Sequence, residues 1–356
     1  MNIVPLRHWG IFPQGSPFVI AGPCSAESKE QVMQSASFLS NAGVGVMRAG
    51  VWKPRTRPGC FEGAGAAALE WLRCAKECHG VKLCCEVASA DGVQSCLDAG
   101  IDMLWIGART SVNPFLVQEI ASALRGTDVP VLVKNPVNYD VGLWIGAFER
   151  LYDSGLRRLG AVHRGVSTEG GKYRNDPAWT MAVALRSSIP EIPLLCDPSH
   201  MGGRREYVRE LSQYALNLGF DGLMIEVHPC PQQALSDAQQ QLSPEEFKSL
   251  FVGPDALVAR NGDEDGIRIA LASLRCEIDE VDEKLLECLS RRMAVSEKIG
   301  RFKRENNIAI LQSDRWESVL ARVVCDGGAL GLDEAFVRRI FSIIHQQSVS
   351  VQQLEK

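Results

Sequence analysis

LCDPSH at Leu195–His200 and MIEVHPCPQQALSD at Met224–Asp237 are the two pieces of this 356-residue chain that decide the fold. Each begins as a short apolar run typical of a β-strand and ends in side chains that bind metal ions. Together they offer the imidazole of His200 and the carboxylates of Glu226 and Asp237. Nitrogen and oxygen ligands at the ends of two buried strands indicate a metal site at one edge of a sheet.

A thiol far upstream completes this donor set. Cys24 lies in AGPCS at Ala21–Ser25, again directly after an apolar run. A thiolate added to an imidazole and carboxylates gives a mixed sulfur, nitrogen and oxygen site, which suits a borderline divalent ion such as Mn, Fe, Co or Zn. We therefore expect the first two thirds of the chain to bring Cys24 to the later ligands.

Apolar runs of strand type recur along residues 1–252 and alternate with segments of helical spacing. Eight such runs have the pattern and the length of a (β/α)8 TIM barrel. A doubly wound sheet is the alternative, but it more often carries a Gly-rich phosphate fingerprint after its first strand, which this sequence lacks. The expected strands are Phe18–Ala21, Val44–Val51, Lys82–Val87, Met103–Gly107, Val129–Val133, Leu156–Val162, Ile192–Cys196 and Gly222–Val227. The lead at Met1–Ser16 is interpreted as a hairpin.

Polar side chains follow almost every expected strand. The carboxyl ends of barrel strands form the active site, so these side chains should meet at one mouth. Any single one could be a surface charge at the start of a loop, but their recurrence indicates a site. The residues concerned are Cys24, Arg48, Lys53, Glu86, Arg109, Lys134, Arg164, His200 and Glu226.

Five of these groups are cationic and would repel one another in an empty pocket, so the substrates should be polyanions. Arg binds phosphate and carboxylate in a bidentate manner, and Lys supplies a point charge. The KPRT stretch at Lys53–Thr56 adds Arg55 and the Thr56 hydroxyl in a loop stiffened by proline, which suits a second phosphate. The residues predict a barrel enzyme with one divalent metal and two phosphorylated or carboxylated substrates.

The last part of the chain has a different character. We interpret residues 253–266 as a linker and residues 267–356 as a helical domain. Ile267–Glu305 contains no proline and repeats apolar residues at helical spacing, which predicts one helix about 60 Å long that needs a partner chain to cover it. Shorter helices are expected at Ser313–Cys325 and Asp333–Gln353, separated by Gly327-Gly328.

Composition and charge argue against several classes of protein. A formal net charge of −5 argues against nucleic-acid binding, and no apolar run is long enough for a membrane span. The N-terminus shows no secretory pattern. Twelve cysteines without a CxxC pair favour reduced thiols and a cytoplasmic location.

The barrel motifs resemble those of the short type I 3-deoxy-D-arabino-heptulosonate 7-phosphate (DAHP) synthases. The sister enzymes that make 3-deoxy-D-manno-octulosonate 8-phosphate share the barrel but lack KPRT, so KPRT favours erythrose 4-phosphate as a substrate. The matching motifs are GPCS at Gly22–Ser25, KPRT at Lys53–Thr56, GAR at Gly107–Arg109, DPSH with GG at Asp197–Gly203, and IEVHP with ALSD within Ile225–Asp237.

This resemblance implies the roles of the barrel residues. It implies a divalent metal, with Mn²⁺ expected and Co²⁺, Fe²⁺ or Zn²⁺ as alternatives, on Cys24, His200, Glu226 and Asp237. Glu86 and Lys134 would hold the attacking water and move protons. Arg55 and Thr56 would bind the phosphate of erythrose 4-phosphate, with Asp197 near its hydroxyls. Phosphoenolpyruvate would be surrounded by Arg48, Lys53, Glu86, Arg109, Lys134 and Arg164.

The helical domain is similar to the all-helical chorismate mutases. The resemblance rests on LRCEIDEVDEKLLECLSRR at Leu274–Arg292, on Lys303, on Asp314-Arg315 and on SVSVQQ at Ser348–Gln353. It implies that Arg292, Arg315 and Arg275 from the partner chain bind the two carboxylates of chorismate. Lys303 and Gln352 would hydrogen-bond its ether oxygen. Trp316 stands where the family usually has Glu, and Gln312 replaces a frequent Asp.

The two resemblances together predict a bifunctional shikimate-pathway enzyme. Prephenate is the expected feedback inhibitor, and a homodimer through the helical domain is the expected assembly, with a tetramer left open. One alternative is that the helical domain is a regulatory binding module with little turnover. Another is a sugar-phosphate aldolase of the barrel class.

Overall fold

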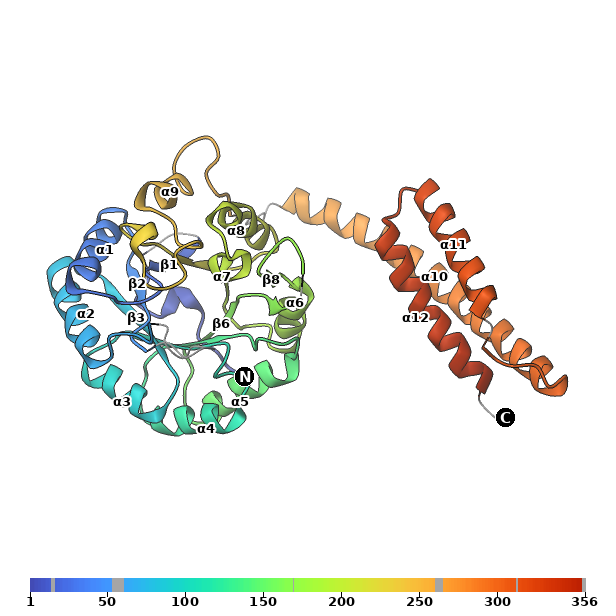
Figure 1. Cartoon of the computed structure of the whole chain (residues 1–356), viewed down its shortest axis with the longest axis horizontal. Coiled ribbons are helices and arrows are strands. Elements are labelled where there is room, and N and C mark those ends of the chain that lie inside the picture. Colours follow the sequence, from blue (N-terminus) through green and yellow to red (C-terminus); the bar gives the residue numbers. More distant parts are fainter. Residues whose placement is uncertain (14–16, 53–60, 169, 260–264, 312, 354–356) are drawn as a thin grey trace. The chain divides into compact units, whose positions relative to one another are not determined.

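The computed structural model describes residues 1–13, 17–52, 61–168, 170–259, 265–311 and 313–353, without the side chains of 265–273, 276, 313 and 314. The chain forms two compact units, residues 1–261 and 262–356 (Figure 1). None of the described helices combines the length and the apolar character that crossing a bilayer requires.

The first unit is a closed barrel of eight parallel strands, so the predicted TIM barrel is confirmed. The strand order around the barrel is β1-β10-β9-β6-β5-β4-β3-β2. All eight expected strands are present, with shorter ends in several cases. Their bounds are β1 Phe18–Gly22, β2 Val46–Ala49, β3 Lys82–Val87, β4 Met103–Ile106, β5 Val131–Lys134, β6 Leu159–His163, β9 Leu194–Cys196 and β10 Gly222–Glu226.

Helices cover the outside of the barrel (Figure 1). Several begin where a polar side chain accepts a hydrogen bond from the first turn, as Ser28, Ser89, Asn113 and Asp140 do. These caps fix the point at which each loop from the barrel mouth turns into a helix. The helices are α1 Lys29–Asn41, α2 Ala66–His79, α3 Ala90–Asp98, α4 Pro114–Ala123, α5 Val141–Asp153, α6 Trp179–Ser188, α8 Val208–Asn217 and α9 Pro244–Ser249.

The core has two layers because successive strand residues face opposite sides of the sheet. On β4, Leu104 and Ile106 pack against the helices, while Met103 and Trp105 fill the barrel interior. The hairpin expected in the lead is wrong for residues 1–13, which contain the 3-10 helix η1 Leu6–His8 and no strand. Leu6 and Trp9 join the interior cluster because their side chains bury more apolar area there than a solvated hairpin would.

Two elements near the mouth were not predicted. A small antiparallel pair, β7 Val166–Ser167 and β8 Asn175–Asp176, follows β6. The short helix α7 Pro198–Gly202 carries the DPSH motif and starts at Asp197, whose carboxylate accepts from the backbone N–H of His200. His200 therefore lies on a helical turn one step beyond the strand end.

The second unit contains three helices, α10 Asp265–Glu305, α11 Ser313–Ala329 and α12 Glu334–Gln353, with α12 packed against the other two. Asp333 caps α12 by accepting from Phe336 N at 2.8 Å. The expected break at Gly327-Gly328 is wrong, because α11 continues to Ala329. A Cβ on Gly327 would lie 2.8 Å from Val337 Cγ2, so this glycine permits close packing of α11 on α12.

Candidate active sites

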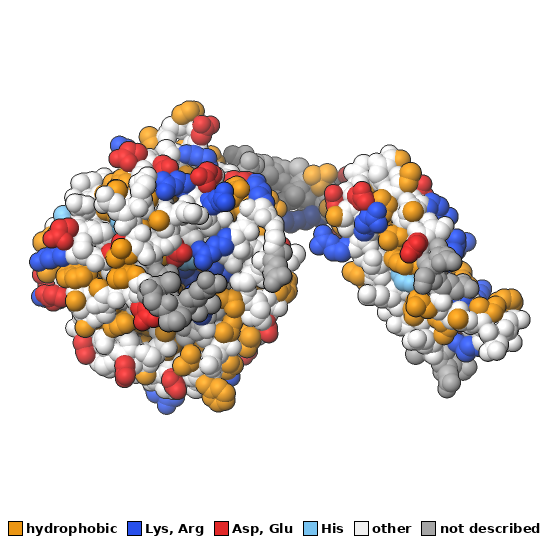
Figure 2. Space-filling model, viewed as in Figure 1, with side chains coloured by type: hydrophobic (Ala, Val, Ile, Leu, Met, Phe, Trp, Pro, Cys, Tyr) orange, Lys and Arg blue, Asp and Glu red, His pale blue; other side chains and the backbone are white. Residues whose placement is uncertain are grey.

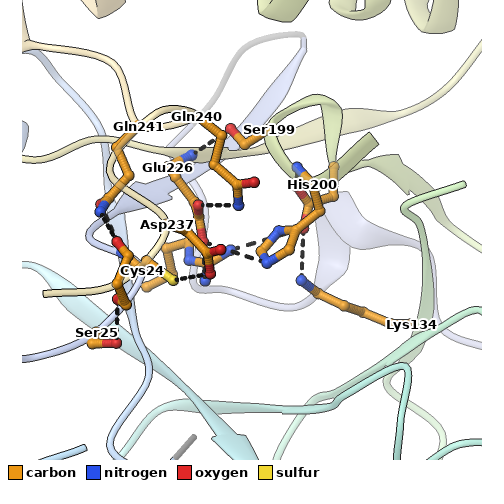
Figure 3. Close-up of polar contacts among 12 residues, drawn as sticks. Cys24, Ser25, Lys134, Ser199, His200, Glu226, Asp237, Gln240 and Gln241 are labelled. Carbon is orange, nitrogen blue, oxygen red and sulfur yellow. Dashed lines mark hydrogen bonds and ion pairs between the residues drawn. The ribbon is translucent and has the colours of Figure 1, made fainter. Parts of the chain in front are cut away.

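Three predicted metal ligands meet at the barrel mouth. Cys24 follows β1, His200 lies on α7, and Glu226 ends β10 (Figure 3). One potential ligand atom from each lies within 4.8 Å of the others. The thiol and carboxylate are buried and the imidazole nearly so, which leaves these donors facing one another instead of water. A sulfur, a nitrogen and an oxygen at these distances can hold a borderline divalent ion.

Asp237 joins this cluster from a loop beyond β10. The Cys24 thiol donates to Asp237 Oδ2 at 3.2 Å. The backbone of Asp237 has a φ of 47°, a left-handed conformation that costs a non-glycine residue on the order of 1 kcal/mol. The surrounding contacts hold it there, as is common for residues that serve a site. Three predicted ligands therefore form one close group, and the fourth, Asp237, contacts the Cys24 thiol at its edge.

Asp197 fixes the orientation of the His200 ring. Asp197 Oδ2 lies 2.8 Å from His200 Nδ1, and burial lowers the pKa of His200. Burial opposes ionisation of Asp197, but His200 and Lys134 outweigh it and hold the pKa of Asp197 well below its usual range. An ionised carboxylate can only accept, so Nδ1 carries the proton and Nε2 presents its lone pair to the cluster.

Polar side chains around the cluster hold the ligands in place, and the sequence analysis missed them. Gln240 Nε2 donates to Glu226 Oε2 at 2.7 Å, and Ser199 Oγ accepts from Glu226 N at 3.0 Å. Gln241 Oε1 accepts from Cys24 N at 2.9 Å (Figure 3). The sequence could have pointed to the two glutamines, because they follow Asp237, a predicted metal ligand, by only three and four residues.

Glu27 links the segment after Cys24 to the loop between Glu226 and Asp237. Its Oε1 accepts from Leu235 N at 3.0 Å, and its Oε2 lies 3.5 Å from His228 Nε2. His228 Nδ1 accepts from a backbone N–H, so the ring proton lies on Nε2 and faces the carboxylate. Glu27 therefore fastens together the two stretches that supply three of the four ligands.

Cations line the mouth beside the cluster. Lys134 Nζ lies 2.6 Å from Asp197 Oδ2, and Arg48 NH2 lies 3.1 Å from Glu226 Oε1. Burial lowers the pKa of Lys134 despite the attraction of Asp197. Burial has the same tendency on Arg48, but Glu226 and Asp197 outweigh it and raise the pKa of Arg48. Lys134 is therefore the cation of this pair that can exchange a proton.

The Arg48 guanidinium is fully buried, and none of its three nitrogens makes a hydrogen bond to the described residues. Its carbon lies 4.9 Å from the centre of the Trp105 ring, which supports the cation from below. Buried donors without acceptors cost about 1–3 kcal/mol each. Such an arrangement fits an anionic ligand that supplies the missing acceptors.

Arg164 and Glu86 add to the charged side chains that Lys134 and Arg48 contribute to the barrel mouth. Arg164 donates to Asn175 Oδ1 at 2.8 Å, and burial lowers its pKa to about 10. Glu86 presses against Gly107, where an added Cβ would lie 2.0 Å from Glu86 Oε1. The GAR motif thus needs its glycine to admit Glu86 beside the segment that carries Arg109. In Figure 2, Lys and Arg side chains gather near the middle of the barrel face in view.

Three predicted substrate residues, Lys53, Arg55 and Thr56, lie outside the described residues.

The helical unit brings together part of the second predicted site. Arg292 on α10 donates to Ser348 Oγ on α12, and Lys303 donates to Ile310 O at 2.7 Å. Gln352 is buried, and its Oε1 accepts no hydrogen bond from the described residues. Arg275 and Arg315 are exposed, so within one chain they are not brought into a closed pocket. Gln312 lies outside the described residues.

Comparison with known proteins supports the family resemblances of both the barrel and the helical unit. Residues 11–256 match the model of the DAHP synthetase I family, and residues 274–353 match that of chorismate mutase type II. The chain is 37% identical over 232 residues to phospho-2-dehydro-3-deoxyheptonate aldolase of Thermotoga maritima, covering 65% of this chain and 67% of that protein.

Solved structures give the same picture for the barrel. The T. maritima aldolase structure aligns with a TM-score of 0.60 and 37% identity, over 65% of this chain and 66% of that one. A truncated form of the T. maritima DAHP synthase aligns with a TM-score of 0.57 and 34% identity, over 65% and 82%. More distantly, 2-dehydro-3-deoxyphosphooctonate aldolase of Legionella pneumophila (strain Corby) is 25% identical over 254 residues, which are 66% of this chain and 89% of that protein.

Proposed function

The chain belongs to the DAHP synthetase I family and carries a chorismate mutase type II domain after the barrel, and we propose that it catalyses both reactions. The barrel joins phosphoenolpyruvate to erythrose 4-phosphate, giving DAHP and phosphate. The helical domain rearranges chorismate to prephenate. The observation that carries the first activity is the cluster of Cys24, His200 and Glu226 beside buried cations.

Cys24, His200, Glu226 and Asp237 are proposed to hold one divalent ion, with Mn²⁺ expected and Co²⁺, Fe²⁺ or Zn²⁺ as alternatives. The donor set and the free lone pair of His200 Nε2 support this assignment. A bound ion would act as a Lewis acid on the aldehyde of erythrose 4-phosphate.

The cations of the mouth bind phosphoenolpyruvate in this proposal. Arg48 supplies a buried guanidinium that is ion-paired but makes no hydrogen bond to the described residues, while Arg109 and Arg164 add positive charge nearby. Lys134, whose pKa is lowered by burial, and Glu86 hold the water that adds at C2 and move its protons. Lys53 is assigned to the same substrate by its motif.

Arg55 and Thr56 are proposed to bind the phosphate of erythrose 4-phosphate. Asp197 is assigned to its hydroxyls, and its ion pairs with Lys134 and His200 add a positioning role. These pairs support this assignment, because they link Asp197 both to His200, a proposed metal ligand, and to Lys134, a proposed phosphoenolpyruvate contact.

In the helical domain, Arg292, Arg315 and Arg275 of a second chain are proposed to bind the two carboxylates of chorismate. Lys303 and Gln352 bind the ether oxygen, where negative charge develops. The rearrangement needs no nucleophile, only a compact conformer and stabilised charge. The contact of Arg292 with Ser348 supports a shared pocket between α10 and α12.

The exposed apolar stripe of α10 supports a homodimer through the helical domain. Ile278, Val281 and Leu285 are 54–59% exposed in a single chain, and Figure 2 shows apolar side chains on the surface of this unit. A second copy would cover this stripe and bring in its Arg275. Prephenate, the product of one domain, is proposed to inhibit the other. The cytoplasmic location stays a prediction.

A coupled assay tests the two activities together. Phosphoenolpyruvate and erythrose 4-phosphate should be consumed with release of phosphate, and chorismate should be converted to prephenate. Aldol cleavage of a sugar phosphate without consumption of phosphoenolpyruvate would favour the aldolase alternative. Synthase activity that responds to prephenate, with no mutase turnover above background, would favour the purely regulatory helical module.

A further inference from the structure

Trp316 of α11 and His345 of α12 stack on each other in the helical unit. Their ring centroids lie 4.0 Å apart, and their planes are inclined by only 14°. Trp316 directly follows Arg315, which is assigned to a carboxylate of chorismate. The ring pair therefore bridges α11 and α12 next to the proposed mutase groups.

His345 lies on the face of α12 that carries those groups. Residues three, four and seven apart share one side of a helix, so His345, Ser348 and Gln352 form one row. Ser348 and Gln352 are 5% and 8% exposed, and Ser348 Oγ accepts from Arg292. The row thus faces α10, and His345 occupies its N-terminal end.

The imidazole is a neutral group in cationic surroundings. Burial lowers the pKa of His345, and the charges of Arg292 and Lys303 act in the same direction. A neutral imidazole has one N–H and one lone pair, so it can donate and accept at the same time.

Chorismate offers two carboxylates, an ether oxygen and one hydroxyl. The arginines, Lys303 and the Gln352 amide account for the first three. The hydroxyl needs an acceptor for its proton, which Arg and Lys cannot provide, and Trp316 has only an N–H and a π face. On the α12 row, Ser348 Oγ already accepts from Arg292 and donates to Ile344 O, and the Gln352 amide is assigned to the ether oxygen. His345 is the remaining member of the row, and its imidazole can both donate and accept.

We propose that His345 hydrogen-bonds the hydroxyl of chorismate and that Trp316, a positioning residue, holds the imidazole plane by stacking. This inference rests on the proposed mutase function of the helical domain. It makes His345 a specificity-determining residue, because discrimination for the hydroxylated substrate would then depend on it.

The test compares chorismate with its 4-deoxy analogue in the full-length protein. Removing the hydroxyl should lower kcat/KM of the wild type about tenfold, the effect of one hydrogen bond. His345→Phe keeps a stacking ring but cannot bond, so its preference for chorismate should fall to about one. His345→Gln restores a donor and an acceptor and should recover part of the preference, while Trp316→Ala should reduce it.

Arg338→Ala, which removes an exposed ion pair with Glu334 on the same helix, is the matched control and should keep the wild-type preference. An unchanged preference in His345→Phe would overturn the inference. If the wild type does not rearrange chorismate at all, the mutase proposal fails. The same preference is then read from calorimetric binding of the two compounds, where equal loss in wild type and variant would refute the role of His345.

Discussion

The barrel site and the helical site are both proposed to bind anionic substrates, but their charged side chains differ in burial and pairing. In the barrel, Arg48, Asp197 and Glu226 are completely buried and paired within one chain. In the helical unit, Arg275 and Arg315 are exposed and the apolar stripe of α10 faces outward. A closed barrel surrounds its own mouth, whereas three helices leave one long face uncovered. The described part of the first site therefore forms within one chain, and we propose that the second depends on assembly.

Removal of the metal ion by chelation should produce the largest difference between the synthase and mutase activities. Treatment with EDTA is expected to lower synthase turnover on the order of a thousandfold, because Lewis-acid stabilisation worth several kcal/mol is lost. Mutase turnover should change less than about twofold, since the rearrangement uses hydrogen bonds and cations. Both rates are measured before and after dialysis, with Mn²⁺ added back. Synthase activity that survives exhaustive chelation would show that the two sites do not differ in their need for a metal ion.

Arg292→Ala should act only in the helical site. Loss of a partly buried cation that is proposed to touch the substrate is expected to lower mutase kcat/KM by about 10²–10³. Arg291→Ala is the matched control, because Arg291 is the exposed neighbour on the same helix. Steady-state assays of chorismate consumption measure both variants. Equal effects of the two substitutions would mean that Arg292 has no special contact with chorismate.

Leu285→Glu tests whether the helical site depends on assembly. A charge in the 55%-exposed apolar stripe should split the dimer and lower mutase activity about a hundredfold by withdrawing the partner's arginine. Lys284→Gln, one position away and also exposed, should leave the dimer intact. Sedimentation velocity reports the assembly. A Leu285→Glu monomer with full mutase activity would show that one chain suffices.

Glu27→Ala tests how far the barrel site is held by contacts outside its ligands. Loss of the hydrogen bond from Leu235 N and of the contact with His228 should weaken metal affinity about tenfold, within the range for groups that orient ligands. Glu30→Ala, an exposed acid three residues on, is the control. Calorimetric titration with Mn²⁺ gives both affinities. Equal affinity in Glu27→Ala and wild type would show that the ligands hold their positions without this link.

The smallest expected effect is on how the stability of the barrel depends on pH, and it comes from His163. It is buried against Trp144 and Trp179, and burial lowers its pKa from 6.5 to about 4. Between these values the unfolded chain binds a proton that the folded barrel excludes. Stability is therefore full above pH 6.5 and declines as the pH falls, by at most about 1.4 kcal/mol per pH unit.

His163→Phe should flatten this decline, whereas replacement of the exposed His8 by Gln should not. Urea unfolding of the barrel, followed at pH 7 and at about pH 5, measures the slope. A slope that is identical in His163→Phe and wild type would assign the decline to other groups.

The sequence was sufficient for the barrel and for the meeting of Cys24, His200 and Glu226, because strand period and the position of polar residues after strands are local patterns. It was insufficient for Gln241 and Glu27, whose contacts with Cys24 and Leu235 span more than 200 residues of chain. It also missed Gln240, whose bond to Glu226 depends on how the loop after β10 folds back. The extent of α11 was mispredicted because Gly327 is kept helical by packing against Val337, a tertiary effect.

The claim on which the rest depends is that Cys24, His200, Glu226 and Asp237 hold a single cation, and cobalt titration tests it most directly. We predict one Co²⁺ per chain, with the near-ultraviolet charge-transfer absorption of a thiolate–cobalt bond. This absorption should vanish in Cys24→Ser and remain in Cys230→Ser, whose sulfur lies on the neighbouring loop. Its persistence in Cys24→Ser, or its absence from the wild type, would contradict the account.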